Sequence, residues 1–288
     1  MDNPYGRTVL ITGASSGIGR ATALALCEKG FRVYGTSRSE RREMEKKCGE
    51  GSIKMLKMDV LDEKSIKAAV DHVVSREGSI DILINNAGWG VAGSVEDISA
   101  EEARRQMDVN FMGAALVIKH ILPIMREKRK GLIINVSSVG GYIWLPFQAY
   151  YSASKSALEA LSEALHIELK PFNIRVSIVE PTDTKTGFTE ARAVAKAALE
   201  NDAYKEEFAR SLKKMAQFEQ NGQEPAEVAK QIIAIIKKKK PPIRRPVGLD
   251  SKLLLVMKRL LPSRWVIAAV GRFYMPGPPE KKTGSKPA

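Results

Sequence analysis

The feature that most constrains the fold is a short apolar segment followed directly by a glycine-rich turn. Thr8-Val9-Leu10-Ile11 is typical of a buried strand, and Thr12-Gly13-Ala14-Ser15-Ser16-Gly17-Ile18-Gly19 follows it without a gap. A helical pattern then runs over residues 20–29. Strand, tight turn and helix form the first half of a βαβ unit, which predicts a parallel sheet.

The glycines in this turn also indicate a ligand. Glycine lets the backbone approach a pyrophosphate closely, and the unpaired N–H groups of the following helix can bind its oxygens. The alternative is a plain turn with no ligand. The residues expected to form the phosphate site are Gly13, Ser15, Ser16, Gly17, Ile18 and Gly19.

The end of the second predicted strand, at residues 32–36, indicates which dinucleotide would bind. A site for an unphosphorylated ribose usually carries an acid about 20 residues after the glycines. This chain has Ser37 and Arg38 there, followed by Glu40, Arg41 and Arg42. Because a hydroxyl and a guanidinium suit a 2′-phosphate, they predict NADP(H) rather than NAD. The alternative is that Arg38 is only a surface residue.

Strands and helices continue to alternate along the chain. Further strands are predicted at 53–58, 80–84, 131–136 and 175–179, with helices at 63–76 and about 100–125. This order predicts an α/β fold, a Rossmann-like doubly wound parallel sheet flanked by helices. We expect one domain over residues 1–250, with one or two helices at about 187–222, a helix at 225–239 and an edge strand at 241–248.

A tyrosine and a lysine lie four residues apart in Tyr151-Ser152-Ala153-Ser154-Lys155. On a helix they share one face, whereas Tyr150 faces away. A fixed ammonium favours the phenolate, so we expect the pKa of Tyr151 to fall from its usual value near ~10. The tyrosine could then exchange a proton with a substrate oxygen. Taken alone, this pattern is more often a solvated helix face.

Together, the motifs make residues 6–190 resemble the short-chain dehydrogenase/reductase family, especially its hydroxysteroid and retinol dehydrogenase-like members. The resemblance implies one Rossmann-like domain, a nicotinamide dinucleotide, and hydride transfer to or from a carbonyl or alcohol carbon. It also implies that the helical segment at about 187–222 is a substrate lid. The motifs that carry the resemblance are Thr-Gly-x-x-x-Gly-x-Gly at 12–19, Asp59-Val60, Asn85-Asn86-Ala87-Gly88, Asn110, Ser138 and Tyr151-x-x-x-Lys155.

The resemblance also implies residue roles. Tyr151 would exchange the proton, Ser138 would hold the substrate oxygen, Lys155 would bind the nicotinamide ribose and Asn110 would hold a relay water. No metal is expected. Thr182 stands where the family often has glycine. Further implied cofactor contacts are Asp59, Val60, Asn86, Ala87, Gly88, Pro181, Thr184 and Thr186.

The net charge of +13 is concentrated at one end of the chain. Residues 237–288 hold 14 Lys and Arg against Asp250 and Glu280, so the preceding 236 residues carry a net charge of only +1. A basic run is usually a solvated face, but it can also bind lipid headgroups, phosphorylated substrates or nucleic acid. We expect no nucleic-acid binding, because this end has few aromatic residues and no recognition motif.

Residues 251–275 form an extension in which apolar residues are interspersed with Lys252, Lys258, Arg259, Arg264 and Arg272. It could pack on its own domain or on a second subunit. It could instead make a peripheral contact with a membrane or cover the entrance for a lipid-like substrate. Residues 276–288 are predicted to be disordered.

Cys27 and Cys48 show no metal-ligand spacing and nothing suggests a disulfide framework, so we expect a reducing, cytoplasmic location. The polar N-terminal residues lack the apolar region of a signal peptide, and no run approaches the ~20 apolar residues of a membrane span. We expect a hydrophobic ketone, aldehyde or alcohol as substrate, and a homodimer or homotetramer. The alternative is a catalytically idle NADP-binding regulator that acts through its basic end.

Overall fold

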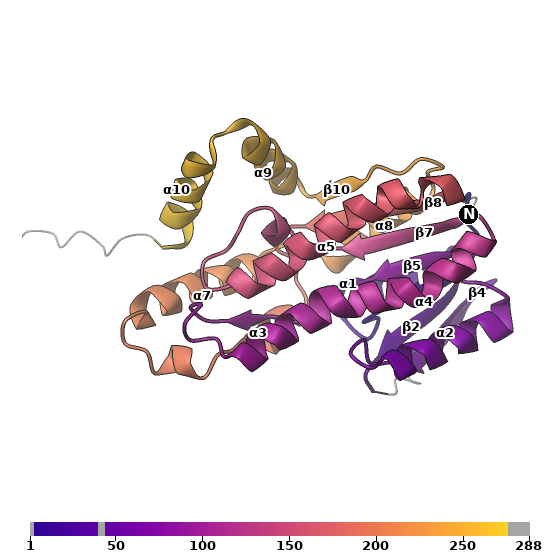
Figure 1. Ribbon diagram of the computed structural model, residues 1–288, viewed down its shortest axis with the longest axis horizontal. Coiled ribbons are helices and arrows are strands. Elements are labelled where there is room, and N and C mark those ends of the chain that lie inside the picture. The colour runs from indigo at the N-terminus through magenta and orange to yellow at the C-terminus, as the bar shows by residue number, and fades with distance from the viewer. Residues whose placement is uncertain (1–2, 40–43, 276–288) are drawn as a thin grey trace, which may run out of the picture.

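The computed structural model describes residues 3–39 and 44–275. In this part of the chain, an eight-stranded sheet lies between layers of helices (Figure 1). Its order is β10-β8-β7-β5-β1-β2-β4-β3, and every pairing is parallel except that of β3 with β4. The strands are β1 (Thr8–Ile11), β2 (Arg32–Ser37), β3 (Lys46–Cys48), β4 (Gly51–Lys57), β5 (Ile82–Asn85), β7 (Gly131–Val136), β8 (Ile174–Pro181) and β10 (Arg244–Val247).

Helices cover both faces of this sheet, which confirms the predicted doubly wound α/β fold. Alternate residues of β1 serve the two cores: Val9 and Ile11 pack on one side and Leu10 on the other. Strands buried on both faces are therefore continuously apolar. The first face carries α1 (Gly17–Cys27) and α8 (Pro225–Ile236), and the second carries α2 (Glu63–Glu77), α4 (Gly113–Glu127) and α5 (Ala149–Glu168).

Smaller elements complete the described chain. A two-stranded parallel sheet lies apart from the main one. It joins β6, which follows β5 in the chain, to β9, which lies within the segment expected to form the lid. The remaining elements are β6 (Val91–Ala92), α3 (Ala100–Met107), η2 (Asp108–Met112), η3 (Val139–Gly141), η4 (Lys170–Phe172), α6 (Phe188–Ala191), β9 (Ala193–Val194), η5 (Ala197–Leu199), α7 (Lys205–Gln220), α9 (Leu249–Leu260) and α10 (Ser263–Tyr274).

Three elements of the structure differ from the prediction. The long helix expected at about 100–125 is interrupted by the π-helical turn η2. The extension is two helices, because Pro262 disfavours a helical conformation at Leu261. Strand β3 was not predicted, since Lys46-Lys47-Cys48 has no apolar alternation. The edge strand is confirmed as β10.

Among the described residues, one helical stretch, residues 100–127, is long enough to cross a membrane and contains an 18-residue window apolar enough to do so, by length and composition alone. The expectation that no segment approaches this length was therefore wrong. The stretch also supplies Val117, Ile121 and Met125 to the core beneath the sheet, which accounts for its apolar character.

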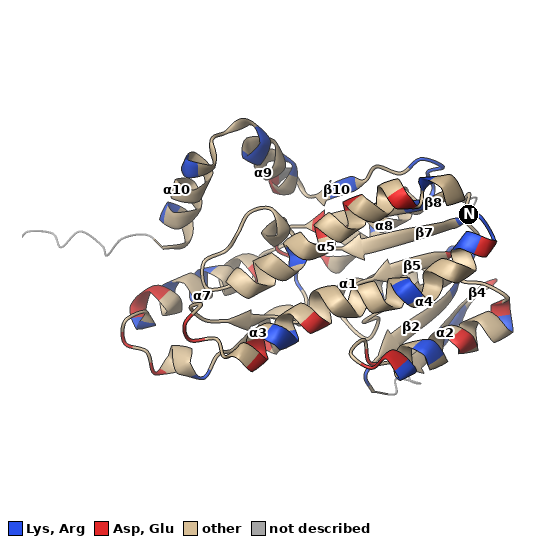
Figure 2. Ribbon diagram, viewed as in Figure 1, with Lys and Arg blue, Asp and Glu red and all other residues tan. Residues whose placement is uncertain are grey.

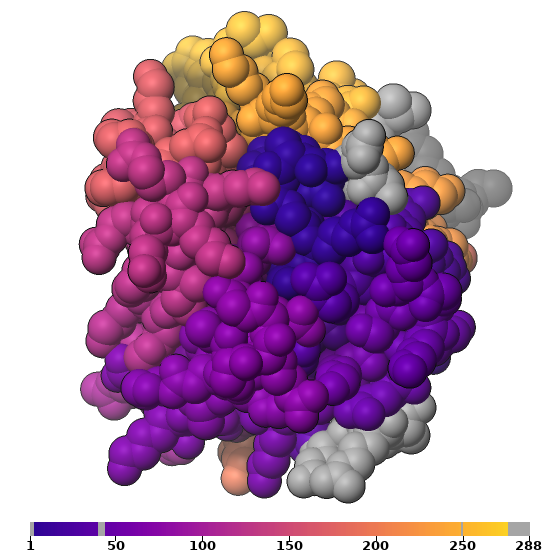
Figure 3. All heavy atoms as spheres, turned by 90° about the vertical axis from the view of Figure 1, so that its right-hand side faces the viewer, coloured from indigo at the N-terminus to yellow at the C-terminus, as the bar shows by residue number. Residues whose placement is uncertain are grey.

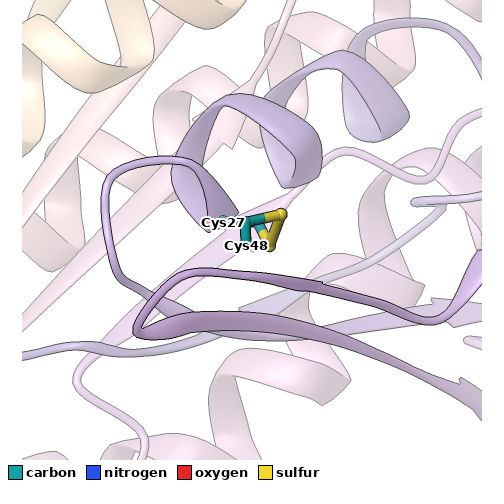
Figure 4. The surroundings of a disulfide bond; sticks show 2 residues. All are labelled: Cys27 and Cys48. Carbon is teal, nitrogen blue, oxygen red and sulfur yellow. A yellow bond between two sulfur atoms is a disulfide. The ribbon is translucent and has the colours of Figure 1, made fainter.

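The two cysteines form a disulfide, contrary to the expectation from sequence (Figure 4). It joins the end of α1 to the hairpin formed by β3 and β4, with the Cα atoms of Cys27 and Cys48 5.6 Å apart. The backbone approaches α1 so closely there that a Cβ on Gly51 would lie 2.0 Å from the Cys27 oxygen. The argument for a reducing compartment loses its premise once the cysteines are paired.

The disulfide should stabilise the fold measurably. Closing a loop with a sequence separation of 21 stabilises a protein by about 3 kcal/mol. We therefore expect reduction to lower the Tm of the wild type by roughly 5–10 °C. Thermal unfolding with and without reductant measures this difference, and Cys48→Ser should abolish it. Two free thiols that titrate in the native, unreduced protein would contradict the pairing.

Candidate active site

The carboxyl ends of six parallel strands meet at one edge of the sheet, where the chain forms a cavity of about 490 Å³. Ligands of open α/β sheets bind at this edge. Every residue predicted to bind the cofactor lines the cavity except Gly19, and every predicted catalytic residue lines it except Asn110. The structure therefore brings the two predicted sets of residues together in one space.

The glycine-rich turn is shaped to hold an anion. Gly13 has a φ of +67°, and a Cβ at this position would lie 2.9 Å from the Cα of Ala87. A Cβ on Gly19 would lie 2.4 Å from the Gly13 oxygen, so this glycine supports the turn from behind. Helix α1 has no side-chain cap and no acid in its first turn, so its N–H groups can bind a pyrophosphate.

Hydrogen bonds hold this turn against the end of β5. The Thr12 hydroxyl accepts from the backbone N–H groups of Asn86 and Ala87, each at 3.0 Å. The Asn86 side chain donates to the carbonyls of Thr12 and Gly13, also at 3.0 Å each. Asn86 thus shapes the turn as well as lining the cavity.

The other end of the cavity is lined by Ser37, Arg38, Asp59 and Val60. Arg38 is exposed at the rim, and the buried Ser37 hydroxyl donates to the Ser39 carbonyl. Residues 40–43 lie outside the described residues, so the expected proximity of Arg41 and Arg42 stays a prediction.

Tyr151, Ser138 and Lys155 surround the inner part of the cavity. Helix α5 carries the tyrosine and the lysine, and Ser138 follows β7 directly. The Lys155 ammonium donates to the Val136 carbonyl at 2.9 Å and lies 5.9 Å from the centre of the Tyr151 ring. The Ser138 hydroxyl accepts from the Gly140 N–H at 3.0 Å, which orients it beside the tyrosine.

The expected fall in the pKa of Tyr151 is wrong for the chain without a cofactor. Burial raises the pKa of Tyr151 to about 12, and hydrogen bonding to Ser138 offsets this only partly. Burial also lowers the pKa of Lys155 to about 8. Desolvation penalises the charged form of each group and is the largest cause of both shifts. The phenol is therefore protonated at neutral pH, which is the form that reduction of a carbonyl requires.

Asn110 lies behind the cavity wall, in the π-helical turn η2. Its amide donates to the Trp89 carbonyl at 3.0 Å and to the Ser154 hydroxyl at 3.1 Å, and its oxygen accepts from the Trp89 N–H at 2.8 Å. Asn110 thus joins the chain after β5 to helix α5. Single π turns are frequent at functional sites. The expected role in holding a water stays a prediction.

The side chains next to Tyr151 and Ser138 in the sequence make their contacts with other groups. Tyr150 packs in a separate apolar cluster with Phe147 and Phe208 beneath the lid. Ser137 lines the cavity, but its hydroxyl donates to Glu159 at 2.6 Å. The opposite carboxylate oxygen of Glu159 binds Arg244 at 2.7 Å, which ties α5 to β10.

The segment after β8 completes the cavity wall. Thr184 donates to the Thr182 carbonyl at 2.8 Å, and the Thr186 hydroxyl accepts from the Phe188 N–H at 3.2 Å. Pro181, Thr184 and Thr186 all line the cavity. Thr182 is not among the residues with positive φ in the described chain, so no glycine is needed there.

Two carboxylates in this wall were not predicted. Glu219 of α7 pairs with the buried Arg192 at 2.7 Å and accepts from Thr189 at 2.7 Å. Burial and the charge of Glu219 raise the pKa of Asp183 to about 6, and Asp183 has no ion-pair partner among the described residues. The position of Asp183 between two expected cofactor contacts could have drawn attention to it. Nothing in the sequence connects Glu219 to the site.

Comparison with known proteins identifies the family to which the motifs point. A family model described as short chain dehydrogenase matches residues 7–197. A 3-ketodihydrosphingosine reductase from Bacteroides thetaiotaomicron is 43% identical over 267 residues, covering 92% of this chain and 97% of that protein. Human retinol dehydrogenase 8 is 34% identical over 267 residues, 88% and 85% of the two chains. The crystal structure of a short-chain dehydrogenase from Streptomyces avermitilis superposes with a TM-score of 0.78 and 32% identity, covering 94% and 99%.

The geometry predicts unequal effects for two adjacent tyrosines. Only Tyr151 reaches the cavity, so Tyr151→Phe should lower kcat by at least ~100-fold through loss of the acid, with NADPH affinity little changed. Tyr150→Phe removes a hydroxyl from the cluster beneath the lid and is the matched control. Steady-state kinetics and cofactor titration measure both effects. A greater loss for Tyr150→Phe would overturn the assignment.

Proposed function

Because the chain belongs to the short-chain dehydrogenase family of oxidoreductases, we propose that it is an NADP(H)-dependent enzyme that interconverts a hydrophobic ketone or aldehyde and its alcohol. One observation carries this proposal: Tyr151, Ser138 and Lys155 surround the same cavity that the glycine turn opens into. A nicotinamide dinucleotide that fills this space from the glycine turn would bring its reactive ring beside the tyrosine.

The chain's own residues would handle the substrate oxygen and its proton. When bound, the reduced cofactor supplies the hydride that adds to the carbonyl carbon. Ser138 would hold the carbonyl oxygen, and Tyr151 would donate its proton as negative charge develops there. The Lys155 ammonium beside the phenol would stabilise the phenolate left behind. Oxidation of the alcohol would reverse each proton transfer.

Ser37 and Arg38 support NADP(H) over NAD. Both residues line the cavity, and Arg38 is exposed and able to turn toward a phosphate. A guanidinium binds phosphate through charge-assisted hydrogen bonds. The preference for a phosphorylated ribose would come mainly from Arg38, because the Ser37 hydroxyl already donates within the chain.

Arg38→Asp should therefore reverse the cofactor preference. A hydrogen bond to a charged group contributes about 1.5–3 kcal/mol, so the loss for NADPH should be roughly ten- to a hundredfold in kcat/KM. Lys57→Asp removes an exposed cation at the end of the neighbouring strand β4 and should leave the preference unchanged. The measurement is kcat/KM with NADPH and with NADH. Equal values for the wild type would contradict the assignment of NADP(H).

For the substrate, we propose 3-ketodihydrosphingosine, as the name of the Bacteroides relative suggests. This compound is a long-chain ketone with an ammonium group on the carbon beside the carbonyl. Asp183 supports the proposal because it lines the same cavity as Tyr151 and has no cation paired with it among the described residues. Glu219 is already neutralised by Arg192, so the negative charge left on this wall is that of Asp183.

Asp183→Asn should separate an amino ketone from a plain ketone. Loss of the ion pair should raise KM for 3-ketodihydrosphingosine roughly tenfold and leave the long-chain 3-ketone without the amine unaffected. Since the pKa of Asp183 is raised to about 6, KM for the amino ketone in the wild type should also rise as pH falls through this value and protonates the carboxylate.

The control for this variant is Asp250→Asn. Asp250 also raises the pKa of Asp183, but it does not line the cavity. An equal loss for both ketones in Asp183→Asn would mean that Asp183 supports the wall rather than binding an ammonium. No turnover of either ketone with either cofactor would overturn the proposed reaction itself.

Neither the site nor the relatives support the alternative of a catalytically idle NADP-binding regulator. For the assembly, we propose a homodimer or homotetramer that forms through the outer faces of α4 and α5. Met112, next to the first residue of α4, and Ile167 of α5 are exposed there. Sedimentation velocity with Ile167→Glu would test this interface, and a monomeric wild type would exclude it.

A further inference from the structure

The C-terminal extension packs on the domain through only one face. Val266 of α10 lies in a small core with Tyr142 and Ile143, which follow η3. The Tyr142 hydroxyl donates to the Ser251 carbonyl of α9 at 3.0 Å. Both helices are therefore part of the fold, and the first interpretation of this segment as packing on its own domain is correct for its inner face. Figure 3 shows the extension, in yellow, at the top of the molecule.

The extension also exposes many large apolar side chains to the solvent. Of the fourteen large apolar side chains that the structure leaves exposed, seven belong to α9, to α10 or to the residue after it. This concentration is far above what scattered surface residues would give. Five of the seven are more than half exposed, and they are here called the apolar patch: Leu253, Val256, Leu260, Trp265 and Ile267.

Basic residues accompany the apolar patch. Lys252, Arg259, Arg264 and Arg272 are exposed on the same two helices, and Lys258 lies 3.8 Å from the centre of the Trp144 ring. Asp250 is the acid that these helices carry. None of the five cations forms an ion pair within the described residues. Figure 2 shows this excess of blue over red on α9 and α10.

Helix α10 also contacts the lid helix α7, which carries Glu219 of the cavity wall. Phe273 of α10 packs on Phe218 of the lid helix α7, with ring centres 5.2 Å apart. Tyr274 lies close enough to Asp183 and Glu219 for their charges to help raise its pKa. A surface bound to the apolar patch would therefore lie next to the entrance of the cavity.

We propose that α9 and α10 bind the surface of an anionic lipid bilayer. Apolar side chains would enter the boundary between headgroups and acyl chains, as amphipathic helices do, and the cations would bind the acidic headgroups. Trp265 suits this boundary because its ring is apolar and its N–H is polar. A second copy of the chain fits less well. A symmetric contact would bring the unpaired cations of one patch against those of the other.

The test measures binding of the full chain to vesicles, which requires no catalysis and is independent of the proposed reaction. The wild type should sediment with vesicles of phosphatidylcholine and phosphatidylglycerol at low salt, and high salt should release it because the charges are screened. It should bind vesicles of phosphatidylcholine alone far less. The emission of Trp265, isolated by comparison with Trp265→Phe, should shift to the blue on binding.

Two double variants separate the contribution of the cations to vesicle binding from that of the apolar side chains. Lys252→Glu with Arg264→Glu should weaken binding at least about 25-fold, since each cation near an anionic surface contributes about fivefold. Leu260→Ser with Ile267→Ser should weaken binding at every salt concentration. These four side chains are exposed, so the variants should fold, and an unchanged thermal unfolding transition would show that they do.

Matched controls lie on other surfaces of the molecule. Lys128→Glu with Lys130→Glu makes the same charge change in the turn before β7, and Val95→Ser removes an exposed apolar side chain from the turn before α3. These variants should bind vesicles as the wild type does. The proposal is overturned if the wild type does not bind anionic vesicles, or if controls and patch variants lose binding equally. It is also overturned if the apolar double variant only splits an oligomer.

Discussion

The site depends on the hydrogen bonds between Thr12 and Asn86, at the ends of β1 and β5. They join two neighbouring strands just past the sheet, where the backbone groups of a parallel strand would otherwise lack partners. The same contacts hold the glycine turn in the shape that an anion needs. The chain after β5 then continues to Trp89, whose backbone is fixed by Asn110. The phosphate end and the catalytic end of the cavity are thus positioned by one continuous set of bonds.

Burial is the largest cause of the pKa shifts of both Tyr151 and Lys155. In the chain alone, each group is desolvated and each resists its charged form. Lys155 also directs its ammonium to the Val136 carbonyl rather than to the phenol. Ribose hydroxyls placed between the two side chains would supply the hydrogen bonds that neither makes with the other. The low pKa expected from the spacing of these residues would then be a property of the complex and not of the helix.

The sequence was informative where local chemistry decides the structure. Continuous apolar strands, the glycine turn and the Tyr151–Lys155 spacing predicted the sheet, its functional edge and the residues around the cavity. It was uninformative where distant segments meet. The pairing of Cys27 with Cys48 depends on β3, a polar edge strand without a recognisable pattern. The direction of the Tyr151 pKa depends on burial, and the charge around Asp183 depends on Arg192, which neutralises Glu219 in the same wall of the cavity.

The cavity has polar groups near Tyr151, and the helices α9 and α10 outside it expose apolar side chains. Together these two features connect the proposed substrate with the proposed binding to a bilayer. A long-chain ketone bound for reduction would place its carbonyl at Ser138 and Tyr151, which leaves its chain to run outward. On the proposed path the chain would run along α7 and α10, where Phe218 and Phe273 lie in contact. Such a chain would otherwise be exposed to water at a cost proportional to its apolar area. An entrance that rests on a bilayer avoids this cost, because the substrate would move from one apolar environment to another. The exposed patch and the cavity mouth therefore make physical sense as parts of one surface.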